Sequence, residues 1–158
     1  MPDHHYIDKG RCPWCGADPL YVAYHDEEWG RPERDPQALF EMLMLEAFQA
    51  GLSWITILRK RAQFRAAFQG FAPEVIAGWG EDEVLRLLQD PGIIRHRGKI
   101  EATIRGAQAY LRIEAREGFA NFIWKHVDHE PIVTNLPDMA AAQGQTAQSQ
   151  ALAKALKN

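Results

Sequence analysis

Two cysteines and a histidine near the N-terminus could bind a metal ion. Cys12 and Cys15 lie three residues apart, and His25 follows ten residues later. Thiolate and neutral imidazole are preferred ligands of Zn²⁺, and a structural zinc site takes four ligands. The spacing also allows free cysteines or a redox-active Cys-Pro-Trp-Cys motif, although such a motif usually follows a β-strand. Histidines that could complete a zinc site are His4, His5, His126 and His129.

A second group of residues could bind a flat, positively charged ring. Glu46 lies on an apolar stripe of a predicted helix, and burying an ionised carboxylate is costly unless a cation or donors meet it. Trp54 follows just after a break at Gly51, so the two side chains suggest an aromatic pocket with an acceptor in its wall. Two simpler interpretations remain: Glu46 pairs with Arg59 or Arg65, and Trp54 belongs to the core. The stripe consists of Leu39, Leu43, Glu46 and Ala50.

The segment Asp90–Lys99 could bind anions such as phosphate groups. Arg95, Arg97 and Lys99 follow a turn at Gly92 and stand at a predicted helix N-terminus, where backbone N–H groups favour anions. The alternative is a helix–helix hairpin whose charges face water. The net charge of −3 does not support a nucleic-acid partner, but residues 1–90 carry 9 basic against 15 acidic residues and residues 91–158 carry 9 against 6. Positive charge is therefore concentrated in the second part of the chain.

Helical periodicity predicts the elements that must position these residues. Asp18 before Pro19 and Asp35 before Pro36 are each an N-cap and N1 pair. No alternating run predicts a β-strand, so the expected fold is all-α with roughly seven or eight helices. The predicted helices begin near 18, span 36–50, run from Ser53 to about 68, open at 73, and span 81–89, 97–116 and 119–127; residues 128–148 form a connector and Ser149 caps a last helix.

The length and composition indicate one globular domain. The chain has 158 residues, of which 46% are apolar and 25% are charged, which are ordinary values for a globular protein. We expect a flexible tail at residues 1–10 and a single helical domain over residues 11–158. No apolar run approaches the roughly 18 residues of a membrane span, and the N-terminus lacks the apolar region of a signal peptide. We therefore expect a cytoplasmic monomer with no membrane partner.

Four separate runs of residues carry a resemblance to a known family. The runs are Arg11-Cys-Pro-Trp14, Asp18-Pro-Leu-Tyr-Val-Ala-Tyr-His-Asp-Glu-Glu-Trp-Gly30, Leu45-Glu-Ala-Phe-Gln-Ala-Gly-Leu-Ser-Trp54 and Gly92-Ile-Ile-Arg-His-Arg-Gly-Lys-Ile100. They closely resemble the bacterial 3-methyladenine DNA glycosylase I family, in order and nearly without gaps. The resemblance implies a compact multi-helix fold of the helix-hairpin-helix DNA glycosylase type. It also implies a base-excision repair hydrolase that flips 3-methyladenine out of alkylated double-stranded DNA and cleaves its N-glycosyl bond.

The resemblance also implies roles for individual residues. Glu46 matches the family's base-recognising carboxylate, which makes it the candidate catalytic residue, with binding as its better-supported role. Trp14, Tyr24 and Trp54 match the aromatic walls of the lesion pocket. Leu52 matches the side chain that fills the gap left in the duplex, as apolar wedges do in other DNA-bending proteins.

The chain departs from the family pattern near its C-terminal end. Cys12 and His25 match the N-terminal pair of the family's structural zinc ligands, whereas the other two ligands lie in a continuation that this sequence lacks. The same continuation carries the DNA-gripping hairpin, so we expect a C-terminally shortened chain with an incomplete zinc site. Ala47, where glycine is common in the family, is expected to narrow the approach to Glu46. The alternative function is a non-enzymatic helical DNA-binding or zinc-stabilised module.

Overall fold

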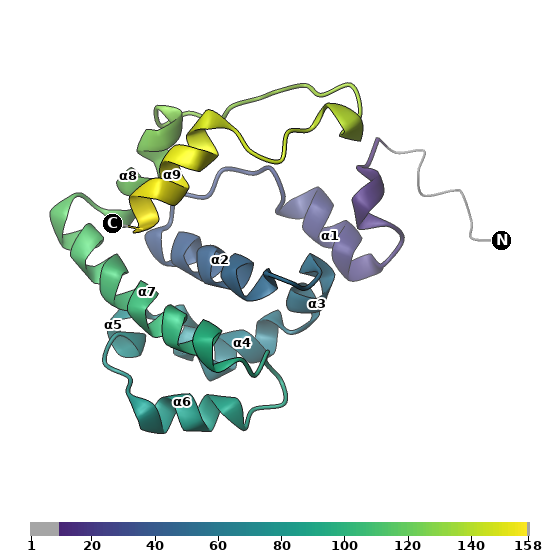
Figure 1. Ribbon diagram of the computed structural model, residues 1–158. Helices are drawn as coiled ribbons and strands as arrows, with labels where there is room; N and C mark the ends of the chain where they lie inside the picture. Colours follow the sequence, from purple (N-terminus) through teal and green to yellow (C-terminus); the bar gives the residue numbers. More distant parts are fainter. Residues whose placement is uncertain (1–9, 158) are drawn as a thin grey trace.

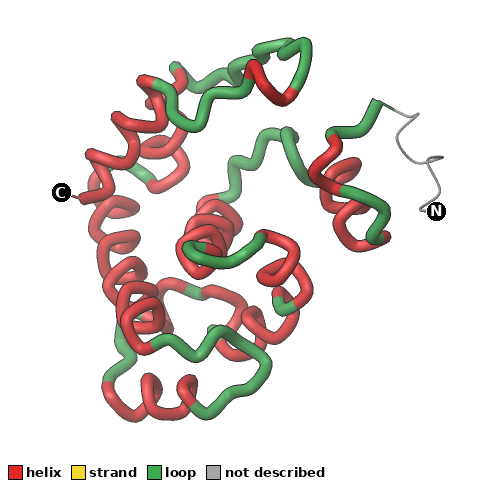
Figure 2. The backbone as a smooth tube through the Cα atoms, turned by 45° about the vertical axis from the view of Figure 1, so that its right-hand side comes forward, coloured by secondary structure: helices red, strands yellow, loops and turns green. Residues whose placement is uncertain are grey.

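The computed structural model describes residues 10–157, and all regular structure within this range is helical (Figures 1 and 2). The all-α prediction is therefore confirmed. The elements in this range are η2 (Pro13–Cys15), α1 (Pro19–Glu27), α2 (Pro36–Gln49), α3 (Trp54–Arg59), α4 (Arg61–Ala67), η3 (Gln69–Phe71), α5 (Pro73–Ile76), α6 (Glu81–Leu88), α7 (Arg97–Arg116), α8 (Phe119–Trp124), η4 (Lys125–Val127), η5 (Met139–Ala141) and α9 (Ala147–Lys157). Over the same residues, no helix is long and apolar enough to cross a bilayer.

The central helix of the fold is α2, which packs against α3 and against the long helix α7 (Figure 1). Its buried face carries Phe40, Met44 and Phe48, one turn apart. The Phe48 ring lies 4.8 Å from that of Phe64 on α4, and both side chains are fully buried. Burying an aromatic side chain of this size stabilises the fold by about 1.5–3 kcal/mol, so these contacts fix how α2 is rotated about its axis.

The rotation of α2 corrects one prediction. The stripe containing Glu46 is not the face that enters the core, because Leu39 and Leu43 are only half-buried and Glu46 is exposed. The core-facing stripe begins one residue later, at Phe40. The sequence carries apolar residues on both stripes, and the larger aromatic side chains occupy the interior because they bury more apolar area.

The predicted helix starts at two aspartates are confirmed. The Asp18 carboxylate accepts a hydrogen bond from the Leu20 N–H at 2.9 Å, and the Asp35 carboxylate accepts one from the Ala38 N–H at 2.8 Å. Each aspartate thus satisfies a backbone donor that has no partner within its helix. The two caps set where α1 and α2 begin, and therefore where their aromatic and acidic side chains point.

Two helix boundaries differ from those expected. The predicted helix from residue 53 to residue 68 is divided at Lys60 into α3 and α4, with no proline or glycine at the break. Ser53 does not cap the backbone of α3, and its hydroxyl pairs instead with that of Thr56 at 2.7 Å. The last helix starts earlier than expected, because the Thr146 hydroxyl accepts from the Ser149 N–H at 3.1 Å.

The predicted connector and the predicted tail are the two segments expected to have little regular structure. Residues 129–146 are loop apart from η5, and they lead back to α9, which packs against η4 (Figure 1). The prediction of a mostly irregular connector is thus consistent with the backbone. The predicted tail falls almost entirely on residues 1–9, outside the described range. The division into a tail and a single domain stays a prediction.

Candidate functional site

Aromatic side chains from η2, α1 and α3 gather on one side of the molecule. The Trp14 ring lies 5.2 Å from those of Tyr21 and Trp29 and 6.3 Å from that of Tyr24. The Tyr24 ring lies 5.6 Å from that of Trp54. Tyr21 and Tyr24 are one helical turn apart, so α1 presents both toward the same neighbours. The structure therefore brings together the three aromatic residues predicted for the pocket.

Glu46 stands beside this aromatic cluster, in the last turn of α2. It has no hydrogen bond or ion pair with any other residue of the described range. Although much of its side chain is exposed, neighbouring groups partly desolvate the carboxyl, and this desolvation raises its pKa. Burial and, to a smaller extent, the Glu46 charge raise the pKa of Tyr24 to about 12, so that phenol stays protonated at neutral pH. A cavity of about 480 Å³ is lined by Glu46, Tyr24 and Trp29 among others. Ala47 does not line this cavity and faces a separate hollow, so the expected narrowing is not observed there.

The arginines that could neutralise Glu46 are paired with other carboxylates. The interpretation that Glu46 binds Arg59 or Arg65 is therefore wrong for the described residues. A carboxylate left without a cation beside aromatic rings has unused capacity to bind a cation or a hydrogen-bond donor. The competing pairs are Arg59 with Asp18 at 2.6 Å, Arg61 with Glu28 at 2.7 Å, and Arg65 with Glu41.

Trp54 contacts both the hydrophobic core and the aromatic cluster. Its ring is half-buried and packs against the hydrophobic core, while Tyr24 lies on it from the side of α1. The indole N–H of Trp54 is buried and has no hydrogen-bond partner within the described range. Buried donors without partners are rare in native proteins, so this N–H is unusual.

The turn between α2 and α3 presents an apolar side chain to solvent. Gly51 has a φ of 81°, a left-handed conformation that glycine adopts without strain. Leu52 follows it with 39% of its surface exposed. Leu52 lies six positions after Glu46, so the predicted pocket carboxylate and the predicted wedge are at the two ends of one short segment.

The basic residues predicted to bind DNA are placed differently from one another. Arg95 is exposed, whereas Arg97 forms ion pairs with Glu81 at 2.8 Å and Glu101 at 3.2 Å. The Lys99 ammonium donates to backbone carbonyls at the end of α2. The N-terminus of α7 is also occupied, because Nδ1 of His96 accepts from the Lys99 N–H at 3.1 Å. Phosphate contact by these residues stays a prediction, best supported for Arg95.

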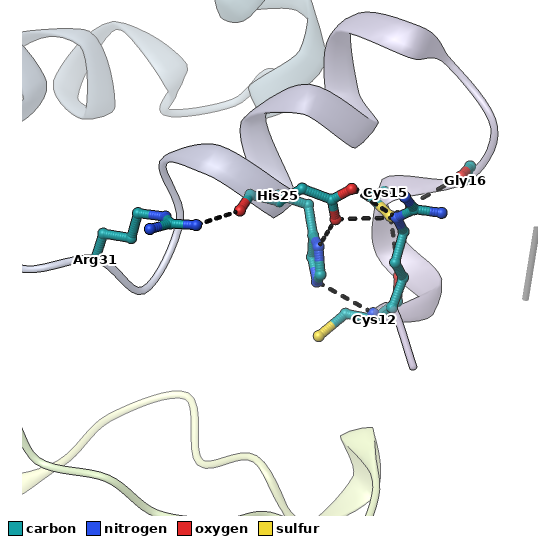
Figure 3. A network of polar contacts seen from close by, with 7 residues as sticks. Cys12, Cys15, Gly16, His25 and Arg31 are labelled. Carbon is teal, nitrogen blue, oxygen red and sulfur yellow. Dashed lines mark hydrogen bonds and ion pairs between the residues drawn. The ribbon is translucent and has the colours of Figure 1, made fainter. Parts of the chain in front are cut away.

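The predicted zinc ligands lie close to each other but do not form a complete site. His25 Nε2 accepts a hydrogen bond from the Cys12 N–H at 3.2 Å, and His25 Nδ1 lies 2.9 Å from Asp26 (Figure 3). The buried Cys15 thiol donates to the Cys12 carbonyl at 3.2 Å. His126 contacts the Phe122 carbonyl on α8 instead.

Among the residues that the structure describes, no three histidine, cysteine or acidic side chains could hold a metal ion together. His4 and His5 lie outside the described range. The Cys12 thiol and the His25 ring supply donors of the type zinc prefers, but they are two of the four that a structural site needs. Zinc binding therefore stays a prediction.

The sequence analysis did not predict two aromatic residues of the cluster as site residues. Tyr21 contacts Trp14, and Trp29 both contacts Trp14 and lines the cavity beside Glu46. Trp29 is 49% exposed, which is unusual for so large an apolar side chain. The available signal was the run of aromatic residues through residues 21–29, which places Tyr21 and Tyr24 on one face of α1 and Trp29 in the turn that follows this helix.

The fold and the site together define a class of protein. This class consists of helical proteins in which a carboxylate without a cation partner lies beside a cluster of aromatic rings. Such an arrangement is suited to binding a flat, electron-poor or cationic ring. An exposed apolar side chain, that of Leu52, stands at the turn that follows the helix carrying this carboxylate.

Comparison with known proteins identifies the family. The sequence model of the methyladenine glycosylase family matches residues 14–158, and the chain belongs to this family. It is 53% identical to DNA-3-methyladenine glycosylase 1 of Escherichia coli, over 93% of this chain and 79% of that protein. It is 49% identical to DNA-3-methyladenine glycosylase of Haemophilus influenzae, over 93% and 80%.

Solved structures agree with this assignment. A crystal structure of 3-methyladenine DNA glycosylase I superposes with a TM-score of 0.91 at 54% identity, covering 93% of this chain and 81% of that one. The enzyme from Staphylococcus aureus superposes with a TM-score of 0.90 at 38% identity, covering 93% and 79%. The predicted fold type is thus confirmed over most of the chain.

Proposed function

We propose that this protein is a DNA N-glycosylase that removes 3-methyladenine from alkylated DNA. The observation that carries the proposal is the Glu46 carboxylate, which lies beside an aromatic cluster while the neighbouring arginines are paired elsewhere. Methylation at N3 gives the adenine base of a nucleoside a positive charge. A site with an uncompensated negative charge and aromatic faces matches that charge and that shape.

Recognition of the base combines two forces. A cationic ring on the faces of Tyr24 and Trp54 gains about 0.5–2 kcal/mol of cation–π attraction when water is excluded. The Glu46 carboxylate accepts a hydrogen bond from the exocyclic amine, and a charge-assisted bond of this type is worth about 1.5–3 kcal/mol. Unmethylated adenine lacks the positive charge, so both terms favour the lesion.

The reaction requires little from the protein beyond holding the base. The bond between C1′ and N9 breaks, its electron pair moves to the base and neutralises the positive charge, and a water molecule adds to C1′ and loses a proton. Because the methylated base is already a good leaving group, protonation of the base is not needed. Before this step the base must leave the duplex stack, and Leu52 fills the vacated space.

The named relatives support these residue roles. The S. aureus structure is described as the structural basis of 3-methyladenine recognition. One related structure carries a tyrosine-to-phenylalanine substitution and holds 3-methyladenine, and another carries a glutamate-to-glutamine substitution. The two substituted positions are as far apart in sequence as Tyr24 and Glu46 are here. Their selection agrees with binding roles for these two residues.

The finer predictions about partners and location follow from this function. The substrate is duplex DNA, and free 3-methyladenine is the product. We expect the protein to act in the cytoplasm, because the bacterial chromosome is the target, and to be a monomer. A non-enzymatic module is the weaker candidate, since the similarity to named glycosylases covers most of the chain. Bound zinc at Cys12 and His25 is a separate proposal, tested by elemental analysis. A zinc content below half an equivalent per protein chain in purified protein counts against this zinc site.

The function is tested by measuring base release. Duplex DNA treated with a methylating agent is incubated with the protein, and released 3-methyladenine is separated chromatographically and quantified. Trp54→Ala is expected to lower release strongly, with helicity near that of the wild type. Ile132→Ala, an exposed change on the connector, is the matched control and should leave release unchanged. Absence of release by folded wild-type protein would reject the enzymatic proposal.

A further inference from the structure

We propose that Lys99 is a positioning residue that holds the Gly51–Leu52 turn in the shape needed to enter DNA, and is not a phosphate contact. The inference rests on the proposed function for its biological meaning. Its structural content, the dependence of one turn on one distant lysine, can be measured independently of catalysis.

The Lys99 ammonium is bonded to the end of the helix that carries Glu46. Its Nζ donates to the Phe48 carbonyl at 2.9 Å and to the Ala50 carbonyl at 2.6 Å. The last carbonyls of an α-helix have no partner within the helix and carry partial negative charge. One cation from the first turns of α7 therefore satisfies two acceptors at the C-terminus of α2, about fifty positions away in sequence.

The turn that follows is held from its other side by Gln49. The Leu52 N–H donates to the Gln49 carbonyl at 2.7 Å, and the Gln49 side-chain amide donates to the Leu52 carbonyl at 2.9 Å. Gly51 permits the reversal because its φ is 81°. Both backbone polar groups of Leu52 are therefore bonded while its side chain remains exposed. Lys99 fixes the residues on either side of Gln49, so it supports the base of this turn.

Lys99 itself is held firmly at its backbone. Its N–H donates to Nδ1 of His96 at 3.1 Å, and its carbonyl accepts from the buried Thr103 hydroxyl at 2.9 Å. These bonds define where the lysine side chain begins. The side chain is thus fixed at both ends before DNA binds, so it loses little further conformational freedom on binding. This is more consistent with a positioning role than with a mobile side chain that contacts phosphate.

The arrangement has a consequence for base flipping. The wedge must enter the duplex while the base occupies the pocket, so the spacing between Leu52 and Glu46 must be correct at the moment of reaction. A misplacement of about 1 Å remote from the chemistry can reduce a rate roughly a hundredfold. Removing the Lys99 ammonium frees two carbonyls and loosens the segment that joins the pocket to the wedge.

The test compares Lys99→Met with Lys99→Arg, alone and combined with Leu52→Ala. Methionine keeps much of the apolar stem and removes the donors, whereas arginine keeps a donor. For Lys99→Met we expect single-turnover release from duplex DNA to fall roughly ten- to a hundredfold. Binding of free 3-methyladenine should change less than about twofold, and Lys99→Arg should recover most of the rate. In a Leu52→Ala background, Lys99→Met should cause little further loss, because the wedge is already absent.

Two measurements separate this role from a phosphate contact and from simple loss of folding. Replacing a phosphate-binding lysine reduces the log–log slope of DNA affinity against salt concentration by about one unit, whereas replacing a positioning residue leaves that slope unchanged. Hydrogen exchange of the Leu52 N–H should accelerate in Lys99→Met, while exchange of core amides such as that of Phe64 stays slow.

Unchanged Leu52 exchange, a reduced salt slope, or a full additional loss in the Leu52→Ala background would each overturn the proposal. Equal acceleration of exchange at core amides would also overturn it, because the lysine would then support the whole fold. The exchange experiment needs no catalysis. If wild-type protein binds no 3-methyladenine and releases none, while Leu52 exchange still depends on Lys99, the proposed function fails and the structural inference stands.

Discussion

Replacement of Glu46 by glutamine tests the electrostatic basis of lesion recognition. The substitution keeps size and one carbonyl acceptor and removes only the negative charge. At 4 Å, two unit charges interact by about 4 kcal/mol at an effective dielectric constant of 20, and by about 1 kcal/mol in water. Glu46 is exposed on one side in the free protein. We therefore expect the loss to fall between these limits, at about 1.5–3 kcal/mol, or roughly a 10- to 150-fold decrease in base release.

The same substitution should not destabilise the fold. Burial raises the pKa of Glu46, so the folded state holds this proton more tightly than the unfolded state does. Stability from this group therefore falls as pH rises from the unfolded to the folded pKa, and the ionised carboxylate is unfavourable to folding at neutral pH. Glu46→Gln removes that cost. Its melting temperature at pH 7 should equal or exceed that of wild type, and the difference should shrink as the pH is lowered through the Glu46 pKa.

The assay is single-turnover release of 3-methyladenine from methylated duplex DNA, run beside thermal unfolding followed by circular dichroism. Glu130→Gln, an exposed change of the same charge on the connector, is the control and should match wild type in both measurements. The reasoning is refuted if Glu46→Gln releases base at the wild-type rate. It is also refuted if the variant unfolds several degrees lower at pH 7, because Glu46 would then be a stabilising ion-pair partner.

Three further predictions concern the turn, the core and the N-terminal segment. Gly51→Ala should destabilise the protein by about 1 kcal/mol, because alanine is strained at a φ of 81° although its Cβ meets nothing within 4 Å; chemical denaturation measures this. Phe64→Ala should cost about 3–5 kcal/mol through an internal cavity, seen as a lower denaturation midpoint, since the side chain is fully buried. Hydrogen bonds from Arg11 and then His25 lower the pKa of Asp26, so its contribution is present above the unfolded pKa and is lost in acid. Asp26→Asn should therefore lower the melting temperature slightly at pH 7, and a difference that persisted in strong acid would contradict this assignment.

Local sequence signals predicted the helices well where a cap was present. The starts of α1 and α2 were correct because an aspartate followed by proline both satisfies a free N–H and presets the backbone. The break at Lys60 was not predictable in the same way, since no residue there disfavours a helix. The orientation of α2 was also misjudged, because two neighbouring apolar stripes compete and only the partners on other helices decide between them.

The sequence predicted which residues form the candidate site, but it did not predict their long-range partners. Residue type and the family resemblance singled out Glu46 and the aromatic residues around it. Glu46 stays without a cation because nearby arginines pair with carboxylates from elements distant in sequence, as Arg61 does with Glu28. No local sequence pattern predicts such pairs. Lys99 shows the same limit, because its position in a basic run suggested a phosphate contact while its actual acceptors are carbonyls from another helix.

The pattern of ion pairs explains how one carboxylate stays available in a neighbourhood rich in arginine. Arg61 and Arg65 line the same cavity as Glu46, and either would stabilise its charge if it were free to approach. Each is held by another carboxylate, so a rearrangement toward Glu46 would break one pair to form another and gain little. The folded protein therefore keeps Glu46 in a state less stable than a paired one. A cationic base is the partner that removes this instability without breaking an existing pair, which makes the binding of the lesion more favourable than the binding of a neutral base.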